Sequence, residues 1–368
     1  MKRPSGAVRR LTALVPYHWG DLRRAAAQAL GALTYVTPRK ALNLALCERE
    51  KQRREARPRS RPYLAVIDAA NLCGLRCPYC PTGCRRDSGR RTRLIDVDMV
   101  RGLLDELDRD LISANLFNWG EPFLHPRLAE IVSLCHDRGV YTNVSTNLNI
   151  RRPDRINDVC DAGLDYLLVS VSGATQPTYE QYHRGGRLEL VLENLDRVLT
   201  RRRRGNRPGP IVEFKYLVFR HNEHEVSEAR SLARRLGVDI FRAEPGGGPP
   251  ESRGRGRTAP REGVQKSVCH QLWHTAVLDA DGGIPPCCYL YFRSDDFAGF
   301  EAGRMMDARN NQAFVAARRL FDPGALACLP PNLSHPCLKC HHVHRQPHLK
   351  DWLAANPHAA PGHRTGGF

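Results

Sequence analysis

Strand-type and helix-type patterns alternate along the chain from residue 62 to residue 245. Short runs rich in branched and aromatic residues are each followed by a longer segment with apolar residues at helical spacing, which is the pattern of βα units. The predicted strands are 63–68, 111–118, 139–145, 166–172, 211–219 and 238–243. The predicted helices are 97–109, 127–138, 152–163, 177–200 and 223–236. Parallel strands with right-handed crossovers follow from this alternation, so the pattern indicates an α/β fold.

Polar residues gather on one face of the later strands. Glu213 and Lys215 share one parity of their strand, whereas Phe214 and Tyr216 occupy the other. A barrel interior filled only for stability would carry branched aliphatic side chains. We interpret the polar face as a pocket for cofactor and substrate, with a buried structural polar network as the alternative. Glu213 and Lys215 are therefore candidate catalytic residues.

Residues 1–61 form a strongly basic arm, with 15 Lys or Arg against 4 Asp or Glu. Helices are predicted from Asp21 to Val36 and from Arg39 to about Glu55. We expect a helical cap packed on the barrel, with contact to an anionic membrane surface or an acidic partner as the alternative. Stacking aromatics are sparse among the arginines, so a nucleic-acid partner is not expected.

Composition fits a globular protein of a reducing compartment. The chain has 368 residues, 41% of them hydrophobic, and no convincing export signal. The longest uncharged run of the arm is fourteen residues, 25–38, and a bilayer span needs about 20. We therefore expect a cytoplasmic protein. In that compartment thirteen cysteines are better explained by cofactor ligation than by disulfides.

Three of these cysteines, Cys73, Cys77 and Cys80, lie within eight residues, directly after the first predicted strand. Three thiolates on so short a loop are able to hold an iron–sulfur cubane and leave its fourth iron without a protein ligand. Ligands in parallel βα folds gather at the carboxyl ends of the strands, which is where this loop lies. A zinc site completed by Cys84 is the alternative.

The spacing C-x3-C-x2-C, with an aromatic residue before the last cysteine, resembles the signature of the radical SAM superfamily. The resemblance implies an open (β/α)6 partial barrel with a [4Fe–4S] cluster whose open iron binds S-adenosylmethionine (SAM). It also implies a low-potential electron donor of the flavodoxin or ferredoxin type. In that family, reductive cleavage of SAM yields a 5′-deoxyadenosyl radical that abstracts hydrogen from a substrate.

A second resemblance lies at 118–122, Asn-Trp-Gly-Glu-Pro, which is similar to the GGEP motif of the family. There, backbone and an acidic residue bind the amino group of the methionine moiety. Trp119 departs from the motif, because the family usually has a glycine at that position. The resemblance implies six cofactor-binding residues: Tyr79, Gly120, Glu121, Asn147, Ser170 and Arg184.

The C-terminal third begins with a Gly/Pro/Arg-rich linker, 246–263. Residues 264–345 resemble a shortened SPASM-type auxiliary cluster domain, and 346–368 read as a flexible tail. The resemblance implies one auxiliary [4Fe–4S] cluster held by Cys269, Cys287, Cys337 and Cys340. A hairpin turn at 279–283 is predicted to bring Cys269 and Cys287 together.

Other readings of the C-terminal cysteines stay open. Cys337-x-x-Cys340-His341 also fits a haem attachment pattern, and these cysteines with neighbouring histidines would suit zinc. Cys288 is left over beside Cys287. It is a candidate catalytic hydrogen donor for an epimerisation, with a spare thiol as the alternative.

These features predict a radical SAM enzyme, with a small molecule or a peptide as its substrate. The arm lacks the strand pattern of a peptide-leader recognition module, which favours dehydrogenation or epimerisation of a sugar-like or aminocyclitol-like intermediate. A peptide-modifying enzyme is the alternative. An iron–sulfur or zinc protein that binds nucleic acid is the alternative from another class.

Overall fold

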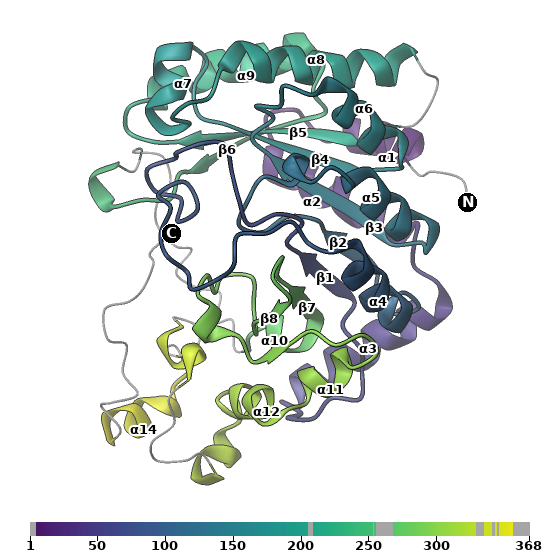
Figure 1. Ribbon diagram of the computed structural model, residues 1–368, viewed down its shortest axis with the longest axis vertical. Helices are drawn as coiled ribbons and strands as arrows, with labels where there is room; N and C mark the ends of the chain where they lie inside the picture. Colours follow the sequence, from purple (N-terminus) through teal and green to yellow (C-terminus); the bar gives the residue numbers. More distant parts are fainter. Residues whose placement is uncertain are drawn as a thin grey trace.

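The computed structural model describes residues 5–204, 209–252, 254, 268–328, 335–340, 343 and 346–355. Its centre is a parallel sheet of seven strands in the order β6-β5-β4-β3-β2-β1-β7 (Figure 1). The strands are β1 (Leu64–Ile67), β2 (Ser113–Asn115), β3 (Tyr141–Thr146), β4 (Tyr166–Val171), β5 (Ile211–Val218), β6 (Ile240–Pro245) and β7 (Thr275–Leu278). Within the described residues β6 and β7 do not pair, so the sheet is open, as a partial barrel requires.

One face of the sheet is covered by the crossover helices. These are α4 (Val97–Leu107), α5 (Leu128–Asp137), α6 (Pro153–Asp161), α7 (Gln176–Tyr182), α8 (Leu188–Arg204) and α9 (Val226–Leu236). Helix α4 illustrates why they form: the Asp96 carboxylate accepts a hydrogen bond from the Asp98 backbone N–H, and apolar residues at helical spacing turn inward. The main core lies between these helices and the sheet.

The predicted helix 177–200 is two helices, α7 and α8. Gly185 has a φ of +82°, a left-handed conformation in which a helix does not continue. A hydrogen bond also fixes the segment between the helices, since the His183 Nδ1 lies 2.6 Å from the Ser172 hydroxyl. The break therefore has a backbone cause that the helical spacing of apolar residues does not reveal.

The basic arm is helical, and its first two helices pack on the inner face of the sheet near the amino ends of the strands. It contains α1 (Ser5–Ala13), α2 (Gly20–Leu33) and α3 (Pro38–Gln52). A second core contains Val8 and Ala27 from α1 and α2, together with Tyr141, Tyr166 and Ile240 from the first residues of three strands. Helix α3 instead joins the main core through Cys47, whose thiol lies 3.4 Å from the Trp273 carbonyl oxygen. None of the described helices is long and apolar enough to cross a membrane.

The seventh strand comes from beyond the predicted linker. Strand β7 pairs in parallel with β1, with Ala276 opposite Ala65, so the C-terminal third contributes to the central sheet. The turn at 279–283 is present, and the Asp279 N–H donates to the Gly283 carbonyl at 2.9 Å. The predicted hairpin pairing is wrong, however. Strand β8 (Gly283–Ile284) instead pairs with β9 (Ala298–Gly299) in a separate two-stranded sheet, and among the described strands β7 pairs with β1 alone.

Short helices complete the C-terminal part, drawn in green and yellow in the lower half of Figure 1. They are α10 (Gln271–His274), α11 (Met305–Arg309), α12 (Gln312–Arg319) and α14 (Leu349–Ala355). Most of the predicted linker and tail, together with His341, lies outside the described residues.

Candidate functional site

The three-cysteine loop follows β1 at the carboxyl edge of the sheet. Burial raises the pKa of the Cys73 thiol to about 12, with smaller contributions from the neighbouring Glu121 and Cys80. The pKa of Cys77 is also raised by burial, and then by Cys80 and Cys73. The three predicted ligands therefore lie close enough to act on one another electrostatically.

This donor set fits an iron–sulfur cluster. Soft thiolates are the ligands that such clusters use, and a bound cationic centre would offset the cost of ionising buried thiols. Among the described residues, no three Cys, His, Asp or Glu side chains converge on the position of a single metal ion. A cubane does not require such convergence, because each thiolate binds a different iron. The Cys84 thiol, the fourth zinc ligand of the alternative reading, donates to the Pro78 carbonyl at 2.8 Å.

Gly120 packs directly against the base of this loop. A Cβ atom at this position would lie 2.0 Å from the Ala70 carbonyl oxygen and 2.5 Å from that of Leu72. The backbone at Gly120 therefore approaches the backbone of the loop closely, at a distance that no other residue type would allow. Trp119 stands where the family has its first glycine; its carbonyl accepts from the Thr82 hydroxyl at 2.6 Å, and its ring meets Tyr291 edge-on at 4.9 Å. This departure from the motif links the loop to the C-terminal third.

Glu121 is buried and already holds three donors. Its carboxylate accepts from the Thr146 hydroxyl at 2.7 Å, the Asn147 N–H at 2.9 Å and the Phe123 N–H at 3.1 Å. Burial raises the pKa of Glu121 to about 7 in spite of these donors. The Asn147 side-chain amide in turn lies 3.5 Å from the Cys73 sulfur. Glu121 therefore orders the end of β3 beside the thiol loop, and its predicted contact with SAM remains a prediction.

Tyr79 and Arg184 lie on the other side of the loop. The Tyr79 ring is 6.1 Å from Tyr182 and 5.8 Å from Phe219, so three aromatic rings pack together there. The Arg76 N–H donates to the Arg184 carbonyl at 3.0 Å, which ties the two loops together. A hollow of about 780 Å³ opens at this junction. Its lining residues are Gly74, Arg76, Pro78, Gly83, Cys84, Arg184 and Gly185.

Ser170, Lys215 and Arg242 are register partners across β4, β5 and β6, so they share the inner face as predicted. The Lys215 ammonium pairs with Glu244 at 3.1 Å and is one quarter exposed. Burial, then Arg242, lowers the pKa of Lys215 to about 8. This part of the polar face is therefore accessible to a ligand.

Glu213, two residues earlier on β5, has no exposed surface. It accepts from the Tyr166 hydroxyl at 2.5 Å and from Arg242 Nε at 2.8 Å, and Arg24 of α2 lies 3.4 Å away. The structure gives Glu213 a place in a buried polar network beneath α2. Its catalytic role remains a prediction.

The four predicted auxiliary ligands come together in the C-terminal third. Burial raises the pKa of Cys337, and Cys287, Cys269 and Cys340 add to that shift. Cys287 is affected in the same way by Cys269 and Cys340. These four cysteines lie up to 71 positions apart in the sequence. In the folded chain their thiols are close enough to shift one another's pKa.

Cys288 lies near Cys269 and Asp279. Burial raises its pKa to about 11, with Asp279 at the barrel mouth and Cys269 as its charged neighbours. At neutral pH this thiol is protonated, the form that a hydrogen donor requires. The side chain of Cys328 is not among those described.

A cluster around Arg90 is absent from the sequence prediction. The Arg90 guanidinium is 2% exposed and pairs with Asp279 at 2.9 Å, Asp281 at 3.1 Å and Asp296 at 2.6 Å. Asp68, at the end of β1, is also buried, and burial followed by Asp279 raises its pKa. An aspartate directly after the apolar residues of the first strand was the one local signal of this cluster.

An open parallel sheet with a three-thiol loop after its first strand defines an α/β protein of the partial-barrel class. Residues 68–233 match the family model of the radical SAM superfamily, so this part of the chain is a radical SAM domain. Such a domain implies a [4Fe–4S] cluster and SAM as cofactors.

Two curated relatives are PqqA peptide cyclases. The chain is 30% identical over 127 residues to that of Bradyrhizobium diazoefficiens, which covers 34% of this chain and 33% of the relative. It is 28% identical over 178 residues to that of Methylorubrum populi, covering 48% and 44%. The chain therefore spans between a third and a half of the length of these relatives.

Among solved structures, SuiB of Streptococcus suis has a similar fold. Its TM-score is 0.53 at 14% sequence identity, and the match covers 85% of this chain and 76% of SuiB. At this identity the likeness establishes the fold alone.

Proposed function

We propose that this chain is a radical SAM enzyme that modifies a peptide, with its catalytic cluster held by Cys73, Cys77 and Cys80. The observation that carries the proposal is the loop after β1, where three interacting thiols lie at the carboxyl edge of an open sheet within the radical SAM match. When bound, the cluster and SAM supply one-electron cleavage of a sulfonium and hydrogen abstraction from the substrate.

The chain's own residues organise this site. Glu121 fixes the Asn147 backbone, and the Asn147 amide then lies beside the Cys73 sulfur, where it helps to orient that ligand. The rings of Tyr79, Tyr182 and Phe219 shield one side of the loop from water. Arg184 lines the adjacent hollow and supplies a cation for the carboxylate of SAM or of the substrate.

The relatives support a peptide as substrate. Both are peptide cyclases by name, at 28–30% identity. They favour the peptide-modifying alternative over the sugar or aminocyclitol substrate. We further propose that Cys269, Cys287, Cys337 and Cys340 hold one auxiliary cluster, which would accept the electron that the substrate radical loses after hydrogen abstraction.

Anaerobic reconstitution tests the cofactor part of the proposal. The chain with iron, sulfide, SAM and a low-potential reductant is expected to release 5′-deoxyadenosine, and Cys77→Ala is expected to release none. A parent chain that binds zinc but no iron or sulfide in anaerobic preparations would overturn the proposal.

Mass spectrometry tests the substrate part. The reconstituted chain is incubated with peptides and, in parallel, with aminocyclitols. A peptide product lighter by the mass of a hydrogen molecule supports the proposal, whereas turnover of the aminocyclitol alone contradicts it.

A further inference from the structure

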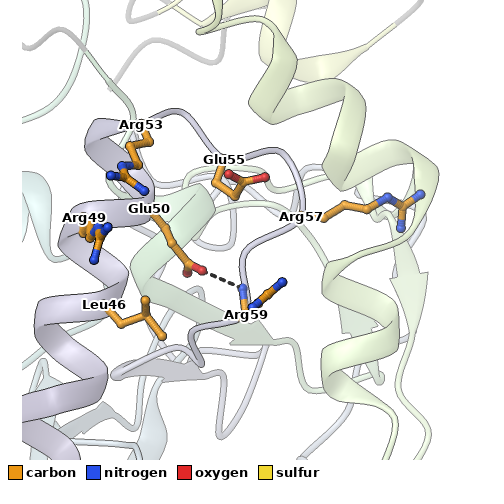
Figure 2. A pocket seen from close by; sticks show the side chains of 7 residues that line it. All are labelled: Leu46, Arg49, Glu50, Arg53, Glu55, Arg57 and Arg59. Carbon is orange, nitrogen blue, oxygen red and sulfur yellow. Dashed lines mark hydrogen bonds between the residues drawn. The ribbon is translucent and has the colours of Figure 1, made fainter.

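A second pocket, of about 370 Å³, lies where α3 ends, and it shares no lining residue with the hollow beside the thiol loop. Figure 2 shows that its side chains come from the last turns of α3 and from the segment that follows. The lining residues are Leu46, Arg49, Glu50, Arg53, Glu55, Arg57 and Arg59.

The lining is positively charged in effect. Glu50 is buried, and its carboxylate accepts the backbone N–H groups of Arg59 and Ser60, each at 2.9 Å. The hydrogen-bonding capacity of this carboxylate is thus used by the wall of the pocket. The lining as a whole, with four arginines and two glutamates, has a formal net charge of +2. Among the described residues, no acidic side chain forms an ion pair with the guanidinium of Arg49, Arg53 or Arg59.

The pocket is shaped by the end of α3. The Arg54 N–H donates to the Lys51 carbonyl, and the Glu55 N–H donates to the Glu50 carbonyl at 2.9 Å. This is a Schellman motif, and Arg54 occupies its left-handed position with a φ of +56°. The reversal folds residues 55–59 back against the helix, so that the arginines of both segments face one hollow.

The returning segment is also fixed to the C-terminal third. The Trp273 indole N–H donates to the Glu55 carbonyl at 3.0 Å, and Arg318 donates to the Ala56 carbonyl at 3.1 Å. Arg57 donates to the Asn310 carbonyl at 2.9 Å. Because these contacts hold the wall in place, ligand binding would not lose conformational entropy by ordering the wall.

We propose that this arginine pocket binds an acidic segment of a peptide, outside the site of chemistry. The inference rests on the proposed function in one respect, namely that the peptide is the enzyme's substrate. Planar guanidinium groups match carboxylates through paired hydrogen bonds. Leu46 is 39% exposed at one side of the pocket, and Leu42, one turn earlier, is 74% exposed. The surface therefore suits glutamates interspersed with leucines.

Other anions fit less well. No aromatic side chain of the described residues lines the pocket, so these residues offer no platform on which a nucleobase would stack. A single phosphate would engage the arginines and leave the exposed leucines beside them uncovered.

Fluorescence anisotropy with a labelled peptide of alternating Leu-Glu-Glu repeats tests the inference. Binding is measured on the reconstituted chain without reductant, so the result does not depend on SAM cleavage. The double variant Arg49→Glu/Arg53→Glu is expected to weaken binding about tenfold or more, and Glu55→Gln to strengthen it about threefold. Arg49→Gln/Arg53→Gln is expected to weaken binding to a smaller extent.

The matched control is Arg197→Glu/Arg235→Glu, which changes two exposed arginines of α8 and α9 by the same charge and is expected to alter binding by less than about twofold. Circular dichroism verifies that each variant is folded. Equal binding by the Arg49/Arg53 variants and the parent would overturn the inference. So would full displacement of the peptide by inorganic phosphate, or tighter binding of single-stranded RNA. Arginine-dependent peptide binding in a chain that fails to cleave SAM would refute the proposed function and leave the pocket assignment intact.

Discussion

Replacing Arg90 by methionine would leave the buried Asp279 without a cation among the described residues, whereas Asp281 and Asp296 would keep the half-exposed Arg293 alone. The guanidinium contacts Asp279, Asp281 and Asp296, and each of these side chains is at most 6% exposed. Removing one partner of a buried ion pair costs about 3–5 kcal/mol, because the remaining charge is neither solvated nor paired. We expect Arg90→Met to lower the free energy of unfolding by an amount in this range at pH 8.

The loss should depend on pH. In the parent, burial raises the pKa of Asp279 from 3.8 to about 7. Between these values the folded chain binds more protons than the unfolded chain, so this group makes stability fall as pH rises. Arg90 lowers the pKa of Asp279, so its removal extends that fall above pH 7. At pH 5 the carboxylate is protonated in both folded proteins, and the difference between them should shrink.

Urea unfolding at pH 5 and pH 8 measures both effects. Arg91→Met is the control, since Arg91 lies on the same loop, is exposed and forms no ion pair among the described residues. It should change stability by less than about 0.5 kcal/mol. A loss below about 1 kcal/mol for Arg90→Met, as for an exposed ion pair, would refute this reasoning. An equal loss at both pH values would refute its electrostatic part.

Three further substitutions test other parts of the structure. Gly120→Ala would bring a Cβ to 2.0 Å from the Ala70 carbonyl oxygen, so we expect about 1–3 kcal/mol of destabilisation and reduced iron binding after reconstitution; unchanged iron content would contradict the close approach. Cys287→Ser should lower the iron content by about four atoms per chain, whereas Cys288→Ser should leave it unchanged, and equal losses in the iron assay would make Cys288 a ligand. Arg54→Gly should raise the free energy of urea unfolding by about 0.5–1 kcal/mol, because glycine adopts a φ of +56° without strain; a destabilised variant would show that the Arg54 side chain contributes more than its backbone costs.

Local pattern was sufficient for the repeating part of the fold. The six strands predicted between residues 62 and 245 all occur, because period-two alternation and the turns that bound it are local properties of a segment. Strand β2 is shorter than predicted, 113–115 instead of 111–118. Local pattern did not identify the partner of β7. Its four residues follow a linker, and pairing with β1 joins segments about 210 positions apart.

The thiol loop was also predictable, since its ligands are adjacent in the sequence. The Arg90 cluster was not, because its members come from the loop after β1 and from residues 279–296, which only the folded chain brings together. Trp119 belongs to the same junction. It departs from the family motif in sequence, and its contact with Tyr291 gives that departure a structural role.

The inner face of the sheet combines two interpretations that the sequence presented as alternatives. Near the amino ends of the strands α2 covers the face, and Arg24 closes a buried network with Glu213 and Tyr166. Two residues further along β5, Lys215 is partly exposed. Strand parity correctly assigned Glu213 and Lys215 to one face. It carried no information on how much of that face α2 covers. The boundary between the buried network and the partly exposed part of the face therefore falls between these two residues, and it is set by the docking of the N-terminal helix α2.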